Sequence, residues 1–295
     1  MKLTFSLVIL FLSLCSFAGL ISEKDCQFFY DDPYETFSRV PKGKYKGVCL
    51  DLEKRRNLKR VTNNQDSLVI ANFLHEGKYW KASIPNGNIF KRVILQVEFF
   101  PPEWIAAHTQ MRFDLKEGKQ ITLEGQNETN KGEILHLSSL IISFEALKSI
   151  KGEKYSLFRG LMDRYALSAR MFSLKTAYNH IVIKKKHKNQ QLLLSFNDKQ
   201  VRTLFDYYVD RANRNSNHKE MYNTLKNNCT TEIYDGLQFV RRMPKLTLDI
   251  FGKEIPLIRK KHFLSFLPVT ARKHLVKREI LKDILLPLEK EVLPF

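Results

Sequence analysis

The sequence lacks the patterns that mark several common classes of protein. It contains no internal repeat, no glycine-rich phosphate-binding loop and no Cys/His cluster with metal-ligand spacing. We therefore expect neither a zinc enzyme nor a nucleotide enzyme, and no cofactor. No zinc-finger or helix-turn-helix pattern is present either, which argues against a nucleic-acid partner.

Long hydrophobic runs are also scarce. The longest, residues 3–14, is shorter than the roughly 20 residues that cross a bilayer, but it has the length of a signal-peptide core. Ser16 and Ala18 provide small residues for cleavage before Gly19. We predict that residues 1–18 are a signal peptide and that the mature, exported protein has no membrane span.

A second interpretation of the N-terminus makes Cys15 a lipid-modified cysteine. Leu14 argues against it, because a small residue normally precedes such a site. We therefore favour the cleaved signal peptide.

Cysteine is rare, and its count is informative. Without Cys15, the chain keeps Cys26, Cys49 and Cys229, an odd number in an oxidising compartment. Cys26 and Cys49 are close in sequence and could form a disulfide, which leaves Cys229 as the free thiol. The alternative for Cys229 is the ordinary one, a small buried apolar residue.

Acidic residues are outnumbered. The chain has 31 Asp and Glu against 49 Lys and Arg, a formal net charge of +18. Such a charge favours anionic partners, and for an exported chain the expected partner is an anionic phospholipid membrane surface. The basic runs, such as "IKKKHK", could alternatively be solvated surface.

The hydrophobic pattern predicts an α+β fold, with an antiparallel sheet packed against helices. Strand-like patterns cover "RVILQVEFF", "HTQMRFDL", "KQITLE", "LSSLIISFE", "NHIVIKKK" and "QQLLLSF". A helical stripe follows in residues 197–214, and a second helix begins at Asn227 or Asn228. We divide the mature chain into an N-terminal elaboration (19–92), a core (93–243) and a basic C-terminal tail (244–295).

This pattern places Cys229 in the first turn of a helix. Unpaired N–H groups and the positive end of the helix dipole there favour a thiolate, which is the nucleophilic form. The same N–H groups could bind the oxyanion that forms when a thiolate attacks an acyl carbon.

A thiol nucleophile also needs a base. His108 is our preferred candidate, because it lies at the head of a predicted strand, on its polar face. His136 and His180 lie at the starts of other predicted strands and remain alternatives. The remaining histidines are in charged or loop-like stretches and are expected to be solvated: His75, His187, His218, His262 and His274.

Three segments carry a family resemblance: "EWIAAHTQMRFDL", "SFEALKSIKGEKYSLFRGL" and "EMYNTLKNNCTTEIYDGL". From about residue 97 to residue 240 the chain resembles the Lnb N-terminal periplasmic domain family. The resemblance implies a circularly permuted papain-like or NlpC-like thiol-enzyme core, in which the histidine strand precedes the cysteine helix. The segment around "GQNETNKGE" looks inserted relative to the family.

The resemblance also implies roles for individual residues. Cys229 would be the nucleophile, His108 the base and Glu145 the group that orients the imidazole, while Asn228 and Thr230 would support the oxyanion site. Each has a purely structural alternative: Glu145 could be a strand-end charge facing water, and Asn228 and Thr230 could only stabilise the helix start.

The namesake members move an acyl chain from a phospholipid to the amino group of a lipoprotein. The resemblance therefore implies a periplasmic, cysteine-dependent acyltransferase whose partners are a membrane surface and a lipoprotein or peptide. Namesake members carry membrane-embedded segments after this domain, where the present chain has its basic tail. Two alternatives remain open: a thiol amidase or peptidase acting on cell-wall peptides, and a binding protein without catalytic activity.

Overall fold

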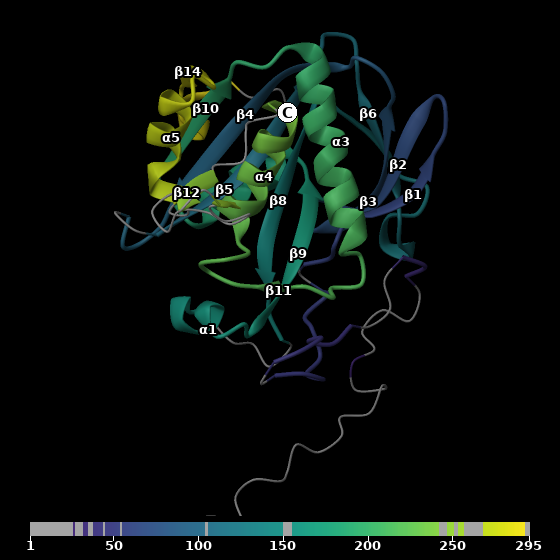
Figure 1. Ribbon diagram of the computed structural model, residues 1–295. Helices are drawn as coiled ribbons and strands as arrows, with labels where there is room; N and C mark the ends of the chain where they lie inside the picture. Colours follow the sequence, from purple (N-terminus) through teal and green to yellow (C-terminus); the bar gives the residue numbers. More distant parts are fainter. Residues whose placement is uncertain are drawn as a thin grey trace, which may run out of the picture.

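The structure is a computed structural model of the chain. It describes Cys26 and residues 32–34, 38–43, 45–53, 55–103, 106–149, 155–241, 247–250, 253–256 and 268–292. The predicted signal peptide lies outside these residues. The described part is an α+β fold in which helices pack against a large mixed sheet (Figure 1).

The central sheet has twelve strands. Its order is β14-β10-β4-β5-β8-β9-β2-β3-β6-β7, with β1 paired to β2 and β11 paired to β9. Every pairing is antiparallel except that of β2 with β9. The strands are β1 (Lys59–Asn63), β2 (Ser67–His75), β3 (Lys78–Pro85), β4 (Phe90–Phe99), β5 (Ala107–Leu115), β6 (Ile121–Gly125), β7 (Ile134–Leu137), β8 (Ser139–Leu147), β9 (Tyr165–Phe172), β10 (Asn189–Leu194), β11 (Met221–Tyr222) and β14 (Leu281–Leu285).

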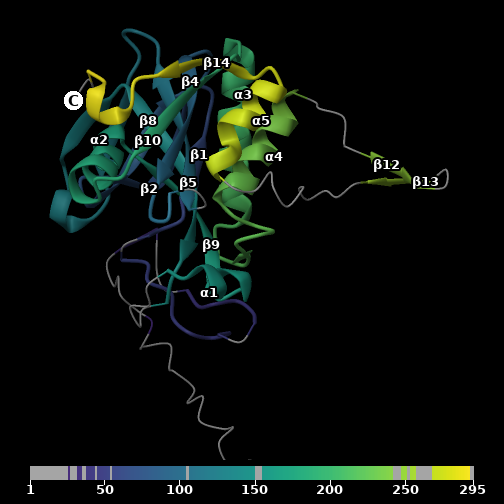
Figure 2. The same ribbon diagram turned by 90° about the vertical axis from the view of Figure 1, so that its left-hand side faces the viewer.

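Helices lie on both faces of this sheet. Figure 2 shows α3, α4 and α5 on one face and α2 on the other. A separate hairpin is formed by β12 (Thr247–Ile250) and β13 (Lys253–Pro256). The helices are α1 (Leu157–Leu161), α2 (Leu174–Tyr178), α3 (Asp198–Arg214), α4 (Cys229–Arg241) and α5 (Ala271–Lys277), with short turns η2 (Glu128–Asn130), η3 (Asn179–Lys184), η5 (Pro268–Thr270) and η6 (Leu288–Lys290).

Helix α3 confirms the predicted helical stripe. Asn197 caps it, because its side chain accepts a hydrogen bond from the N–H of Gln200. Helix α4 packs closely against α3 at Gly236, where an added Cβ would lie 2.4 Å from Cε1 of Tyr208. The buried residues of α3 are those of the predicted stripe: Val201, Leu204, Phe205, Tyr208, Val209 and Ala212.

The alternation of β5 and β8 assigns their side chains to the two faces. Met111, Phe113 and Leu115 of β5 belong to the main core beneath α3 and α4. His108 therefore points to the opposite face, and so does Ser143 of β8, whose neighbours Ile142 and Phe144 are in the main core. This opposite face is the one that α2 covers.

The strand predicted for "NHIVIKKK" is wrong. Residues 179–184 continue α2 as a π-helical segment, η3. The apolar spacing explains this: Leu174, Ala177 and Ile181 follow a helical repeat and share a buried cluster with Ile141 and Leu288. Taken alone, "HIVIK" alternates like a strand. The helical repeat becomes visible only when the preceding residues, 174–178, are included.

Both ends of the described chain are held by contacts with other segments. Cys26 and Cys49 form a disulfide bond, with Cα atoms 5.2 Å apart. The basic C-terminal tail contributes α5 and also edge strand β14, which pairs with β10. Cys229 is thus the free cysteine of the described residues.

Candidate active site

Cys229 is the first residue of α4, as the sequence predicted. Asn228 fixes the helix start: its side-chain oxygen accepts the N–H of Thr231 at 2.9 Å, and its own N–H donates to Thr231 Oγ1 at 2.8 Å. In the described part of the chain, the N–H groups of Cys229 and Thr230 donate to no other residue. The first turn therefore presents two free donors next to the thiol.

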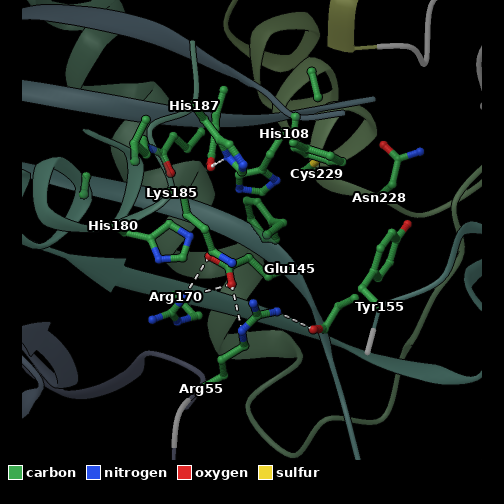
Figure 3. A pocket seen from close by; sticks show the side chains of 18 of the residues that line it. Arg55, His108, Glu145, Tyr155, Arg170, His180, Lys185, His187, Asn228 and Cys229 are labelled. Atoms are coloured by element: carbon green, nitrogen blue, oxygen red, sulfur yellow. Dashed lines mark hydrogen bonds and ion pairs between the residues drawn. The ribbon is translucent and has the colours of Figure 1, made fainter. Parts of the chain in front are cut away.

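The fold brings His108 to Cys229, although the two are far apart in sequence (Figure 3). Helix α4 starts beside the first residues of β5, since Thr109 Oγ1 donates to Thr230 Oγ1 at 3.3 Å. The imidazole of His108 and the sulfur of Cys229 lie close enough for each to shift the pKa of the other. The proposed base and nucleophile thus form one pair.

Each member of the pair shifts the pKa of the other. Burial lowers the pKa of His108, but the negative charge and hydrogen bond of Cys229, with smaller effects of Glu145 and Glu98, raise this pKa to about 9. Burial raises the pKa of Cys229, but the charge and hydrogen bond of His108 and hydrogen bonds from Thr109 lower it to about 7. Between these values the pair is a thiolate beside an imidazolium.

Ser143 holds the other side of the imidazole. Its hydroxyl oxygen lies 2.7 Å from Nε2 of His108, and the side chain is fully buried. Since Ser143 engages Nε2, Nδ1 is the ring nitrogen left for the sulfur. We did not single out Ser143 from the sequence, although the alternation of its strand put it on the same face as Glu145.

Glu145 makes different contacts from those that the family resemblance implied. Arg170 Nη1 donates to both of its oxygens at 2.9 and 2.8 Å, and Arg55 Nε lies 3.3 Å from Oε2. Burial raises the pKa of Glu145, but the two guanidinium charges hold it well below the usual range. Glu145 therefore neither faces water nor hydrogen-bonds His108 within the described residues; it acts on the imidazole through its charge.

Asn228 and Thr230 stabilise the helix start in this structure. The side-chain amide of Asn228 donates to the carbonyl of Thr224 at 2.6 Å, while its oxygen caps α4. Thr230 is fully buried, and its Oγ1 lies 3.8 Å from the sulfur of Cys229. The oxyanion donors closest to the nucleophile are therefore the backbone N–H groups that these two side chains hold in place.

A cavity of about 460 Å³ opens onto the Cys229–His108 pair. Its walls combine apolar side chains with a basic cluster, and Figure 3 shows Arg55, Arg170, His180 and Lys185 on the side away from Cys229. The apolar lining comes from strands, the β4–β5 connection, α2 and η3: Leu74, Phe100, Ala106, Ala107, Phe144, Ala146, Phe172, Ala177 and Ile181.

Several histidines differ from the expectation of solvated side chains. His75 is buried and bonds Ser173 Oγ at 2.8 Å, and His218 is also buried, which lowers its pKa to about 3. His187 bonds Glu98 Oε1 at 2.6 Å in the cavity wall. His136 is exposed on β7, and His262 lies outside the described residues.

A comparison with known protein families assigns the chain to one of them. The model of the Lnb N-terminal periplasmic domain matches residues 88–265, more than half of the chain, and the match includes His108, Ser143, Glu145 and Cys229. The chain belongs to this family. The Lnb N-terminal domain is a periplasmic domain.

No curated protein and no solved structure shows significant similarity to this Lnb-type chain. Across the described residues, we find no helix that is both long enough and apolar enough to span a bilayer.

Proposed function

We propose that this Lnb-type protein is a cysteine-dependent acyltransferase of the cell envelope. It moves an acyl chain from a phospholipid to the amino group of a lipoprotein through a thioester on Cys229. The observation that carries the proposal is the pairing of the Cys229 thiol with His108 where a partly apolar cavity opens beside free helix N–H groups. An ester carbonyl placed there meets a nucleophile, a proton donor and an oxyanion site together.

In the first half-reaction, the thiolate of Cys229 attacks the ester carbonyl of the donor. The oxyanion is stabilised by the N–H groups of Cys229 and Thr230. The carbon–oxygen ester bond breaks, the leaving alkoxide takes the proton of the His108 imidazolium, and the acyl group remains on sulfur as a thioester. Ser143 keeps the ring in place during this transfer through its contact with Nε2.

The second half-reaction uses the same groups in reverse. Once Cys229 is acylated, its negative charge is gone, and the largest favourable contribution to the raised pKa of His108 goes with it. The neutral imidazole can then take a proton from the attacking amine. An amide bond forms, the thioester bond breaks, and Cys229 leaves as a thiolate beside the imidazolium.

The proposal includes a circularly permuted papain-like arrangement. Strand β5, which carries His108, precedes helix α4, which carries Cys229, and both contribute to one packed unit. This chain order is the one that a permuted thiol enzyme requires.

The membrane surface is the proposed partner on the donor side. The whole chain has a net charge of +18, and an exposed basic segment, residues 184–186, lies at the C-terminal end of η3 beside exposed Ile183. Lysine side chains attract anionic lipid, and an exposed apolar side chain can enter the interface. We expect binding to anionic vesicles that weakens as salt is added.

The central test is the acyl-enzyme. Protein incubated with a phospholipid should gain the mass of one acyl chain, and peptide mapping should place it on Cys229, with no adduct on Cys229→Ala. An amine acceptor should then remove the acyl group as an amide. An unmodified thiol under conditions that support transfer would contradict the proposal.

The same experiment separates the alternatives. A thiol amidase or peptidase would cleave cell-wall peptides in a Cys229-dependent manner and pass its acyl group to water. A binding protein without activity would show a Cys229 that iodoacetamide modifies only after denaturation.

A further inference from the structure

The wall of the cavity carries more basic charge than its own carboxylates neutralise. Besides its histidines and Cys229, the ionisable residues of the wall include three bases, Arg55, Arg170 and Lys185, and two carboxylates, Glu98 and Glu145, which leaves one formal positive charge in excess. The Cys229–His108 pair does not change this balance, because its thiolate and imidazolium cancel. An apolar cavity with an excess positive charge favours an amphiphilic ligand with an anionic group.

Both carboxylates of this wall are already engaged. Glu98 bonds His187, and Glu145 is held by the bidentate contact of Arg170 and by Nε of Arg55. Glu145 thus holds the two guanidinium groups near each other, and no ion pair between Glu145 and Lys185 is present among the described residues. This is the role of a carboxylate that aligns an anion-binding pair of arginines rather than that of a full counter-charge.

Two cationic groups of the wall keep unused donors. Arg55 bonds Glu145 through Nε and the Ala146 carbonyl through Nη1 at 2.7 Å, so Nη2 is uncommitted among the described residues. Lys185 also lines the cavity, and its ammonium has no partner within the same part of the chain. A guanidinium N–H and an ammonium that face one cavity are suited to the oxygens of a phosphate group.

We propose that Arg55, Arg170 and Lys185 form a phosphate subsite that holds the headgroup of the acyl donor while the apolar walls take its chain. The inference rests on the proposed acyl transfer and specifies its donor: a phosphate-bearing ester is used in preference to a neutral one. Arg170 aligns the subsite through Glu145, and Arg55 and Lys185 contact the phosphate.

The test compares two short-chain donors that differ in the phosphate: dihexanoyl phosphatidylglycerol and dihexanoylglycerol. The rate of acyl-enzyme formation on Cys229 is measured by intact mass for the full chain and for Arg55→Gln and Lys185→Gln. We expect each variant to lower the ratio of the phosphatidylglycerol rate to the dihexanoylglycerol rate about tenfold, the effect of one lost charge-assisted hydrogen bond.

The matched control is Lys184→Gln. Lys184, the last residue of η3, is exposed like Lys185, but it does not line the cavity, so its removal should leave the ratio at the wild-type value. Equal ratios for all three variants and the wild type would overturn the subsite, as would a loss in the control as large as that in Lys185→Gln. Because Lys185 is exposed, its variant remains informative if Arg55→Gln fails to fold.

Two further measurements distinguish a failure of the proposed function from a failure of the phosphate subsite. If Cys229 forms no acyl adduct even with p-nitrophenyl acetate, the proposed function fails; if it does but the phosphate gives no advantage, only the subsite fails. Inorganic phosphate and dihexanoyl phosphatidylglycerol are also compared as protectors of Cys229 against iodoacetamide. Stronger protection by the lipid supports a donor headgroup, whereas equal protection overturns that assignment in favour of free phosphate.

Discussion

The ion pair between Cys229 and His108 gives the most direct prediction. Its thiolate should titrate near pH 7 in place of the ordinary thiol value of 9.0. A displacement of this size corresponds to about 3 kcal/mol of preference for the charged form, at 1.36 kcal/mol per pH unit. The thiolate is lost as the pH falls through its pKa, and the imidazolium is lost as the pH rises through about 9.

The assay is the second-order rate of alkylation by iodoacetamide as a function of pH. We expect wild-type reactivity to rise with an inflection near pH 7. His108→Ala removes the charge and the hydrogen bond that lower the pKa and leaves the burial that raises it, so its inflection should move to pH 9 or above. At pH 7 the thiolate fraction, and with it the rate, should fall about 50-fold.

Acyl transfer itself should follow a bell-shaped pH profile. Its acid limb reports thiolate formation and its alkaline limb the loss of the imidazolium, so activity should be highest between about 7 and 9. His136→Ala, which removes an exposed histidine on β7, is the control and should keep the wild-type alkylation curve. An inflection that is the same in His108→Ala as in the wild type would refute the ion pair.

Three substitutions test the surroundings of this pair. Ser143→Ala removes the contact to Nε2, so we expect acyl transfer to fall about tenfold, with a lower alkaline limb in its pH profile; an unchanged profile would exclude a positioning role. Glu145→Gln leaves Arg170 buried without its carboxylate and should lower the free energy of unfolding by about 3–5 kcal/mol, measured by urea denaturation. A midpoint equal to that of the wild type would show that this ion pair contributes nothing to stability. Gly236→Ala should destabilise the α3–α4 contact by about 1–3 kcal/mol, because the new methyl group meets the ring of Tyr208; a thermal midpoint equal to that of the wild type would contradict that packing.

The sequence by itself determined the local elements and the chemistry of the two principal residues. The helical stripe of α3, the capped start of α4 at Cys229 and the strand that begins near His108 all follow from periods and capping residues within short windows. The odd cysteine count identified the free thiol, and the motifs identified the family. These signals are local, so a single sequence carries them.

Contacts between distant segments required the tertiary structure. The groups that surround the imidazole of His108 depend on strand register. Strand β8 pairs with β5 and β9 so that Ser143 lies opposite Gln110 and Arg170. Arg170 in turn donates to the carboxylate of Glu145, two residues after Ser143. Alternation placed Ser143 and Glu145 on one face, but it could not say which of them reaches His108.

The cavity is also a product of tertiary structure. Its basic wall joins Arg55, from before the first strand, to Arg170 on β9 and to Lys185 after η3. The strand predicted for "NHIVIKKK" (residues 179–186) failed because Ile181 and Val182 pack in one cluster with Ile141 and Leu288, contacts that no local window contains. Periodicity thus determined the elements, and the register and packing of distant segments decided which side chains meet around the thiol.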